Sequence, residues 1–231
     1  MELSKRLYTI ASLVKNVDTV ADIGTDHAYI PIYLLKNRVC NFAIAGDINK
    51  GPIEKAKSNI DREGLHNEIK TRLGGGLSVI HKGEVQCTII AGMGGDLIRD
   101  IIHSDIEKFK ALDYAIVQPV QNADVFRKYV YEMGFSILEE KICYEDDKFY
   151  EILKIAYGED KKEVDPIYYE VSKLLIDKKD NMVKQYIEYL IDKYKGILNN
   201  TKSDTDNWKK RAYELELKIS KLRSCLYDFD S

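Results

Sequence analysis

Short apolar runs alternate with amphipathic segments through the first two thirds of the chain. Runs typical of buried strands lie at residues 19–24, 42–48, 69–75, 87–92 and 114–120. Segments with apolar residues at helical spacing lie between them, at 52–64, 94–110 and 122–134. Near-continuous apolar strands that alternate with helices are typical of a parallel sheet covered on both faces. We therefore expect an α/β fold with a doubly wound, Rossmann-like sheet.

The pattern changes after Gly134. Residues 135–147 and 149–158 form two adjacent strand-like runs with no helical segment between them. Such a pair predicts an antiparallel hairpin that is added at the edge of the parallel sheet.

Beyond residue 158 the pattern is helical. In the last segment, apolar residues are spaced four, three, four, three and four apart: Trp208, Ala212, Leu215, Ile219, Leu222 and Leu226. The preceding helix carries an apolar stripe that Lys178 interrupts: Tyr168, Val171, Leu175, Met182, Tyr186, Leu190 and Tyr194. The linker 199–207 is short and polar, so we expect an antiparallel coiled-coil hairpin whose first arm, about 30 residues, extends on the order of 45 Å. Two ordinary helices packed on the core are the alternative.

Glycine content marks the boundary between the two parts. Twelve of the 14 glycines precede Gly158, so loops that need unusual backbone angles are confined to the first part. A charged stretch that ends at Pro166 follows and suits the start of a new helix. We expect one domain over residues 1–158 and a helical appendage, a candidate tRNA-contacting element, over residues 159–231.

Composition narrows the class of protein. The 231 residues carry 35 Lys and Arg against 38 Asp and Glu, which excludes the overall basic character of a histone-like protein. Hydrophobic residues make up 45% of the chain, enough for a packed core. The four cysteines are scattered without a C-x-x-C pair, so we expect reduced core thiols rather than disulfides or a metal site. The N-terminus is amphipathic rather than a signal peptide, and no run reaches the length of a membrane span, so we expect a cytoplasmic protein.

The loop after the first strand carries Gly24, Thr25, Asp26 and His27. A glycine at a strand end lets the backbone approach a ligand. The other glycines of a dinucleotide fingerprint are missing, and the Asp26 carboxylate would repel a pyrophosphate. The loop instead suits a cationic, phosphate-free nucleoside such as S-adenosylmethionine, with Gly24, Thr25 and His27 as cofactor-binding residues. A tight strand-to-helix turn without a ligand is the structural alternative.

Three further loops follow the next strands. Asp47 and Ile48 end the second strand, where an acid can accept both ribose hydroxyls of a nucleotide. A helix N-cap is the other role for Asp47, but it lies several residues before the helix expected from Pro52. The third and fourth strands are followed by Gly75, Gly76, Gly92, Met93 and Gly94. Ligands of open α/β sheets lie at the carboxyl ends of strands, so the four loops together predict one cofactor site.

The strings DIGTDHAYIP, IAGDINKGP, RLGGGLSVI, TIIAGMGG and QPVQNADVFR occur in this order, and a helical segment follows them. With these motifs, essentially the whole chain resembles the bacterial tRNA (adenine(22)-N1)-methyltransferase family. The resemblance implies a class I methyltransferase domain, S-adenosylmethionine as donor, S-adenosylhomocysteine as product, and an adenine in the D-arm region of tRNA as acceptor. The chain departs from the family at Gly75, where an aspartate is usual; in related sheets that acid contacts the adenine amino group.

The implied chemistry suggests roles for polar residues near the strand ends. Adenine N1 has an in-plane lone pair, so positioning should supply much of the rate. The methylated base becomes cationic, and a carboxylate could stabilise it or accept a proton from the exocyclic amine; Asp26 is the catalytic candidate. Gln118 and Asn122 are candidate contacts to an extruded adenine, although Asn122 equally suits a capped turn. Asp96 is expected to be the N-cap of the next helix.

Basic residues on the first helix and before the last heptads are candidate tRNA contacts: Lys5, Arg6, Lys209, Lys210 and Arg211. The alternative interpretation of any one such cluster is a solvent-exposed helix face that binds no tRNA. We expect tRNA as the partner, no membrane, no metal and a monomeric chain. Three alternatives stay open: an NAD-dependent enzyme, disfavoured by the missing glycines and the strand hairpin; a methyltransferase for another RNA or a small molecule; and a non-catalytic RNA-binding module, disfavoured by Asp47 and the loop glycines.

Overall fold

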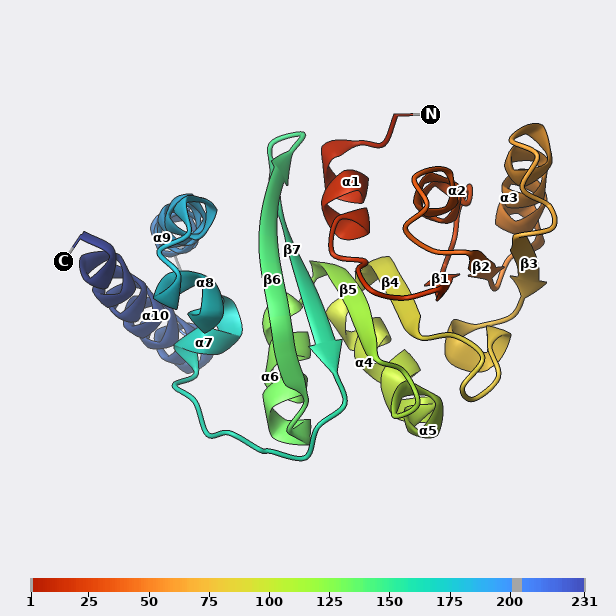
Figure 1. Ribbon diagram of the computed structural model, residues 1–231. Helices are drawn as coiled ribbons and strands as arrows, with labels where there is room; N and C mark the ends of the chain where they lie inside the picture. Colours follow the sequence, from red (N-terminus) through yellow and green to blue (C-terminus); the bar gives the residue numbers. More distant parts are fainter. Residues whose placement is uncertain (1, 201–204, 231) are drawn as a thin grey trace. The chain divides into compact units, whose positions relative to one another are not determined.

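The computed structural model describes residues 2–200 and 205–230. The chain forms two compact units, Met1–Glu163 and Val164–Ser231, which Figure 1 colours from red to green and from cyan to blue. The first unit holds the sheet, and the second contains helices but no strand among its described residues.

The first unit contains one seven-stranded sheet with the order β3-β2-β1-β4-β5-β7-β6. Its strands are β1 (Thr19–Ile23), β2 (Phe42–Asp47), β3 (Ile69–Leu73), β4 (Cys87–Gly94), β5 (Tyr114–Gln121), β6 (Ser136–Glu145) and β7 (Lys148–Ala156). The first five are parallel, and β7 pairs antiparallel with both β5 and β6 (Figure 1). The Rossmann-like sheet and its terminal strand hairpin are confirmed. The strand order reverses between β1 and β4, which is where ligands bind in open α/β sheets.

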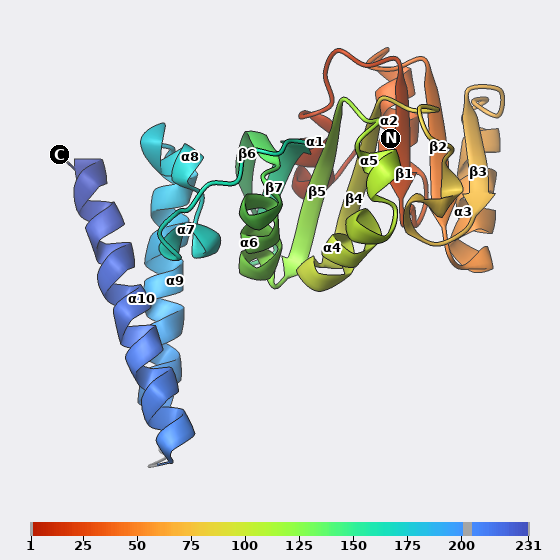
Figure 2. The same ribbon diagram turned by 90° about the horizontal axis from the view of Figure 1, so that it is seen from below.

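Helices cover both faces of this sheet (Figure 2). One face carries α1 (Lys5–Ala11), α2 (Tyr29–Lys36) and α3 (Lys50–Arg62); the other carries α4 (Gly95–Ser104), α5 (Ile106–Phe109), α6 (Ala123–Met133) and the 3-10 helix η1 (Gly76–Val79). Alternate strand residues serve the two cores: Val20 packs with α1 and α2, whereas Ala21 and Ile23 pack with α4 and α6. All four cysteines are free and buried, which confirms the expected core thiols.

The single helix expected over 94–110 is wrong, because the chain breaks at Asp105. This residue has φ −122° and ψ 38°, outside helical geometry, and it separates α4 from α5. Beyond the break, α5 is tied to η1, because Lys108 Nζ donates to the Leu77 carbonyl oxygen at 2.9 Å.

A buried ion cluster joins the strand hairpin to α6. The Arg127 guanidinium is fully buried and donates to Glu140 of β6 at 2.9 Å and to Glu151 of β7 at 2.5 Å. A buried arginine between two carboxylates is stable only while all the partners are present. This cluster therefore helps to hold the antiparallel edge of the sheet in place.

The chain after β7 stays with the first unit as far as Glu163. Gly134 ends α6 with a left-handed φ of +77°, and a Cβ there would lie 2.7 Å from the Glu159 carbonyl carbon. Residues 159–161 thus run directly over Gly134. This contact explains why the division between the units falls a few residues after Gly158.

The second unit contains α7 (Ile167–Glu170), α8 (Lys173–Asp177), α9 (Asn181–Asn200) and α10 (Asp206–Asp230). The unbroken first arm of about 30 residues is therefore wrong. The Ser172 hydroxyl accepts from the Leu175 amide at the start of α8, and the Asp180 carboxylate accepts from the Met182 amide at the start of α9. These caps split the segment, so that α9 has 20 residues and spans about 30 Å.

Helices α9 and α10 lie side by side and form the helical hairpin (Figure 2). Leu215, Ile219 and Leu222 of α10 are buried as the spacing predicted. On α9 the buried stripe is Val183, Ile187, Leu190, Ile191 and Tyr194, so the predicted stripe is displaced by one residue at Met182 and Tyr186. Residues 201–204 of the predicted linker lie outside the described residues. No helix in the described ranges is long and apolar enough to cross a membrane.

Candidate functional site

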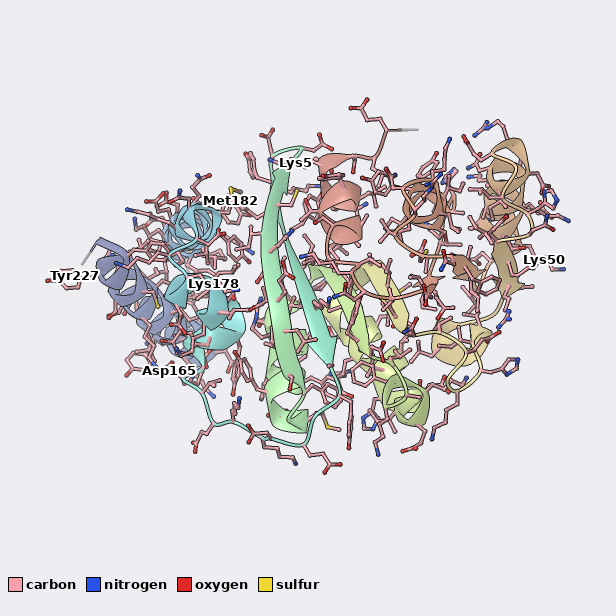
Figure 3. The ribbon with its side chains drawn as sticks, viewed as in Figure 1. Lys5, Lys50, Asp165, Lys178, Met182 and Tyr227 are labelled. Carbon is pink, nitrogen blue, oxygen red and sulfur yellow. The ribbon has the colours of Figure 1, made fainter. Side chains whose placement is uncertain are left out.

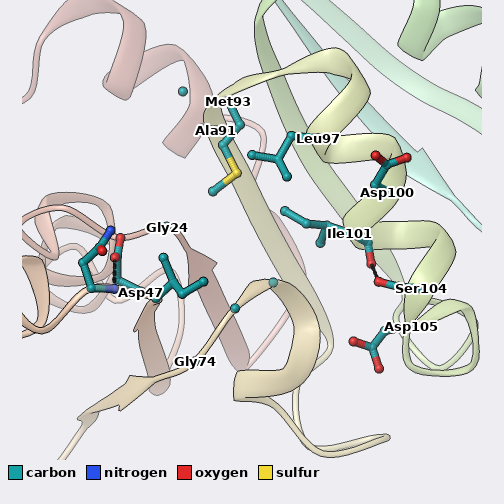
Figure 4. Close-up of a pocket in the computed structure, with 15 residues that line it drawn as sticks. Gly24, Asp47, Gly74, Ala91, Met93, Leu97, Asp100, Ile101, Ser104 and Asp105 are labelled. Atoms are coloured by element: carbon teal, nitrogen blue, oxygen red, sulfur yellow. Dashed lines mark hydrogen bonds between the residues drawn. The ribbon is translucent and has the colours of Figure 1, made fainter.

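The loops at the carboxyl ends of β1, β2, β3 and β4 meet at one edge of the sheet. The amides of Gly24 and Thr25 both donate to the Gly46 carbonyl oxygen, at 2.8 and 2.9 Å, which ties the first loop to β2. A pocket of about 580 Å³, called here the larger pocket, opens beside them (Figure 4). It is lined by residues at the strand ends and just after them, Gly24, Asp47, Ile48, Asn49, Gly74, Gly75, Gly76, Ala91, Gly92 and Met93, and on the α4 side by Leu97, Asp100, Ile101, Ser104 and Asp105.

Asp47 lies at the mouth of the larger pocket, at the end of β2. One carboxylate oxygen accepts from the Asn49 amide at 2.7 Å (dashed in Figure 4). Helix α3 begins at Lys50 with Asn49 as its N-cap residue, so Asp47 does not cap it. The second carboxylate oxygen accepts no hydrogen bond from any described residue, and Asp47 lines the pocket, as the predicted ribose contact requires.

The loop after β3 brings bare backbone into the larger pocket. Gly76 has φ +54°, and a Cβ there would lie 3.1 Å from the Ile101 side chain. At Gly75, by contrast, a Cβ would meet only the end of Ile48, at an ordinary 3.4 Å. A side chain would therefore fit at Gly75. The α4 wall of the pocket was missed from the sequence, because nothing local indicates that Ser104 and Asp105 face the loop after β3.

A second pocket of about 330 Å³, called here the smaller pocket, adjoins the larger one. Both are lined by Gly24, Ala91 and Gly92, so they meet between the ends of β1 and β4. The other lining residues of the smaller pocket are Arg6, Leu7, Asp22, Thr25, Asp26, His27, Ala28, Tyr29 and Ile30.

Asp22 is a buried acid in this smaller pocket, with only 7% of its surface exposed. Burial raises the pKa of its carboxyl group to about 6; the Thr25 hydroxyl opposes this and the negative charge of Asp47 adds to it. The sequence did contain a signal for Asp22: an acid within the otherwise apolar strand 19–24 is costly to bury, and such acids are often found at functional sites. Asp22 is not among the candidates that the sequence analysis selected.

Asp26 and His27 form a pair at the rim of the smaller pocket. The His27 ring lies with Nδ1 2.8 Å from an Asp26 carboxylate oxygen, and it stacks on Tyr29 with the ring centroids 5.0 Å apart. The Asp26 side chain is 69% exposed, so it is accessible from the pocket mouth. The Asn59 amide donates to the His27 carbonyl oxygen at 3.0 Å and connects this loop to α3.

The carboxyl end of β4 closes over the loop after β1. A Cβ at Gly24 would lie 2.2 Å from the Met93 methyl carbon, so Met93 covers the space that Gly24 leaves. Gly95 is required on steric grounds, because a Cβ there would lie 2.1 Å from the Asn122 carbonyl oxygen. Gly94, a predicted cofactor contact, is the N-cap residue of α4 and lines neither pocket.

Gln118 and Asn122 do not line either pocket. Gln118 is buried; its Oε1 accepts from Arg6 Nη1 at 2.8 Å and its Nε2 donates to the Pro119 carbonyl oxygen at 2.8 Å. Asn122 is exposed and donates to an Asp96 carboxylate oxygen at 2.6 Å. The expected N-cap role of Asp96 is wrong, because Gly94 is the N-cap residue of α4 and Asp96 lies in its first turn. The expected base contacts of Gln118 and Asn122 stay predictions.

The candidate tRNA contacts are separated in the structure. Lys5 is exposed on α1 beside the tip of the strand hairpin (Figure 3), where its Nζ donates to the Tyr144 carbonyl oxygen. Arg6, by contrast, lines the smaller pocket. Lys209, Lys210 and Arg211 are exposed near the start of α10, in the other unit. Within residues 2–200 and 205–230, no group of His, Cys, Asp and Glu side chains is placed to hold a metal ion.

Comparisons with known proteins agree with this geometry. Residues 3–153 match the model of a methyltransferase domain family. The sheet order, and the pockets at the strand ends within this range, thus define the class: a Rossmann-like methyltransferase domain.

Individual relatives narrow the class. The tRNA (adenine(22)-N1)-methyltransferase of Bacillus subtilis is 41% identical over 159 residues, which cover 69% of this chain and 67% of that protein. A putative tRNA (m1A22) methyltransferase of Streptococcus pneumoniae in complex with S-adenosyl-L-methionine has a TM-score of 0.86 and 30% identity, covering 97% of this chain and 100% of that chain. M. capricolum TrmK in complex with S-adenosyl-homocysteine has a TM-score of 0.85 and 28% identity, covering 99% and 100%. This chain belongs to the tRNA (adenine(22)-N1)-methyltransferase family.

Proposed function

We propose that this protein transfers a methyl group from S-adenosylmethionine to N1 of adenine 22 in tRNA. The observation that carries the proposal is the pair of contiguous pockets between the ends of β1 and β4. The larger suits a nucleoside, and the smaller suits a charged amino-acid end. The named activities of the relatives are the second support.

The larger pocket has the groups that a ribose and an adenine ring require. Asp47 offers a carboxylate oxygen to the ribose hydroxyls, in charge-assisted hydrogen bonds. Ile48, Leu97 and Ile101 supply apolar surface for the ring. Asp22, Asp26 and Asp47 line the two pockets, so the pyrophosphate of a dinucleotide would meet like charges. This arrangement favours a phosphate-free donor over NAD.

The smaller pocket suits the amino-acid end of the donor. Asp22 is buried there, and an α-ammonium group beside it would favour its ionised form. The donor would therefore extend from the larger pocket past Gly24, Ala91 and Gly92, with its reacting centre near the residues that the pockets share.

Catalysis in this site is chiefly positioning and charge stabilisation. The bound donor supplies an electrophilic methyl group on a cationic sulfur. Adenine N1 attacks with its own lone pair, so no general base is needed for the attack itself. The base becomes cationic, and the exposed carboxylate of Asp26, held by His27 at 2.8 Å, is the candidate to stabilise it.

We propose that the protein acts as a monomer in the cytoplasm, where tRNA is processed. We assign tRNA contact to the exposed basic residues of the hairpin, Lys209, Lys210 and Arg211. Replacing all three by glutamine should weaken tRNA binding and reduce its salt dependence while donor affinity stays unchanged. Equal tRNA affinity in both proteins, measured at two salt concentrations, would remove the hairpin cluster from the interface.

The decisive experiment compares two unmodified tRNA transcripts, one with adenine and one with guanine at position 22. The protein and S-adenosylmethionine are added, and modified nucleosides are mapped by mass spectrometry. We expect N1-methyladenosine at position 22 of the first transcript and none in the second. Methylation of both transcripts at another nucleotide would overturn the position, and methylation of neither would overturn the tRNA activity.

Asp26 is tested separately by single-turnover methylation with saturating tRNA and donor. Asp26→Asn keeps the shape of the side chain and removes its charge, so the rate should fall while donor affinity changes little. Asp61→Asn, on the exposed face of α3, is the matched control. A wild-type rate for Asp26→Asn would leave Asp26 with a structural role only.

A further inference from the structure

A further hollow lies beside α1 and α2, next to the smaller pocket. It has a volume of about 700 Å³ and is called here the outer hollow; it is lined by Glu2, Leu3, Lys5, Tyr8 and Tyr33. Helices α1 and α2 lie side by side at this place (Figure 1). Arg6 and Leu7 of α1 line the smaller pocket, so neighbouring residues of one helix serve the two openings. The outer hollow therefore adjoins the candidate site, although the proposed donor fills only the other two pockets.

Two tyrosine rings form a corner in the outer hollow. The rings of Tyr8 and Tyr33 have their centroids 6.1 Å apart and their planes at 83° to each other. Tyr8 is 54% exposed, and its hydroxyl forms no hydrogen bond with any described residue. A flat aromatic ligand can therefore stack on one ring and meet the other ring at a right angle. Stacking on aromatic side chains is how proteins commonly hold unpaired nucleobases.

Further aromatic rings connect the outer hollow with the rim of the smaller pocket. Tyr29 lines the smaller pocket, stacks on His27 and precedes Tyr33 by four residues on α2. This spacing places both tyrosines on one face of the helix, about 6 Å apart along its axis. Two stacked steps of a nucleic-acid strand, at about 3.4 Å each, cover this length. A nucleotide that neighbours the target adenine therefore reaches the outer hollow while the adenine lies beside Asp26.

The charges around the outer hollow suit a base better than a phosphate. Glu2 and Lys5 both line it, and their opposite charges offset each other. The strand hairpin holds α1 in place, because Lys5 Nζ donates to the Tyr144 carbonyl oxygen at 3.0 Å and the Arg6 amide donates to a Glu145 carboxylate oxygen at 3.3 Å. The Tyr8 ring is thus carried by a fixed helix, which lowers the entropy that is lost when a ligand stacks on it.

We propose that the outer hollow binds a nucleobase of tRNA, the neighbour of the target adenine in the sequence, and that this base stacks on Tyr8. Tyr33 forms the second wall. The proposal rests on the proposed function, because it requires tRNA as the substrate. An enzyme that acts on a stacked base must first take that base out of the stack. A stacking place for the neighbouring base keeps the strand open beside the adenine, so Tyr8 is a positioning residue for the acceptor.

The test combines changes in the protein with changes in the RNA. Three synthetic tRNAs are compared: the intact molecule, one that lacks the base before adenine 22, and one that lacks the base after it. Tyr8→Ala should weaken binding of intact tRNA by about five- to a hundred-fold, the loss of one base stack, and should raise KM for tRNA. Its melting temperature and its affinity for S-adenosylhomocysteine should stay at the wild-type values. The slope of tRNA affinity against salt should also stay the same, because no phosphate contact is lost.

The abasic tRNAs identify the stacked base. One of them should bind wild-type protein more weakly by a similar factor, whereas Tyr8→Ala should bind it as well as it binds intact tRNA, because the two changes remove the same contact. Tyr8→Phe keeps the ring and should behave as the wild type does. Tyr8→Leu keeps side-chain bulk against Tyr33 and replaces Tyr8→Ala if the latter is unstable. Tyr227→Ala, which removes an exposed tyrosine near the end of α10, is the control.

Fully additive losses with both abasic tRNAs would overturn the proposal. A lower salt dependence in Tyr8→Ala would overturn it as well, because it would indicate a phosphate contact. In both cases wild-type protein that methylates intact tRNA at adenine 22 would leave the proposed function standing. Wild-type protein that neither binds nor methylates intact tRNA would overturn the proposed function, and this proposal with it.

Discussion

Replacing Asp22 by asparagine should stabilise the folded protein at neutral pH and weaken donor binding. The Asp22 carboxyl is buried, and its pKa is raised from 3.8 to about 6. A shift of about two units corresponds to about 3 kcal/mol of unfavourable free energy when the group is ionised in the fold. Asparagine keeps the shape and carries no charge, so Asp22→Asn should gain up to about 3 kcal/mol of unfolding free energy at pH 7.5.

The direction of the stability change follows from how the unfolding free energy depends on pH. Between pH 4 and 6 the folded protein holds the Asp22 proton more firmly than the unfolded chain does. The contribution of this group to stability is therefore favourable at low pH and is lost as the pH rises through about 6. Unfolding free energies of wild-type and Asp22→Asn proteins, measured by denaturant titration without donor, should diverge over this window and differ by a constant amount above pH 7.

Donor binding should change in the opposite direction. An ammonium group loses its ionic partner in Asp22→Asn, so affinity for S-adenosylhomocysteine should fall at least about tenfold. In the wild type, affinity should decline as the pH falls below about 6, because the carboxyl group becomes protonated. Asp61→Asn controls for the change in net charge. An Asp22→Asn protein that is less stable than the wild type at pH 7.5, with the same pH slope, would refute this reasoning.

Three further outcomes follow from the same geometry. Asp47→Ala should lower donor affinity by roughly 1.5–3 kcal/mol without unfolding the protein, and calorimetry that finds equal affinity would remove Asp47 from the site. Gly75→Asp should leave the melting temperature unchanged, because the added Cβ makes only an ordinary 3.4 Å contact. It should also raise donor affinity several-fold by restoring an acid near the adenine, and weaker donor binding would contradict this. Arg127→Met should lower the unfolding free energy by about 3–5 kcal/mol, because two carboxylates stay buried without a cation. Adding Glu140→Gln and Glu151→Gln should recover much of that loss, and no recovery would argue against the ion cluster as the cause.

The sheet and its loops were predictable because the signals are local. An apolar run of strand length indicates a strand that is buried on both faces. All five parallel strands begin within a residue of where that pattern predicts them. Gly24, Asp47, Gly75 and Gly92 were predictable as site residues because they lie at or just beyond strand ends, and parallel strands bring their carboxyl ends to one edge of the sheet. The motif strings added the family, which the comparisons confirm.

The helix breaks lay beyond this reasoning. Asp105 ends α4 by its backbone angles, and Ser172 and Asp180 start new helices by accepting single hydrogen bonds. The apolar periodicity of the sequence continues across these helix breaks, so it does not predict where they occur. The length of the hairpin arm was overestimated for this reason.

The sequence by itself determined the strands, their loops and the family. Only the tertiary structure decided which distant residues complete the site. Arg6 and Gln118 are 112 positions apart and share a 2.8 Å hydrogen bond, while Asp105 faces a loop about 30 residues before it. Such contacts depend on how α1 and α4 pack against the sheet, and that packing is set by many side chains at once. No local pattern contains it, and for this reason Arg6 resembled a surface phosphate contact in the sequence although it forms a wall of the smaller pocket.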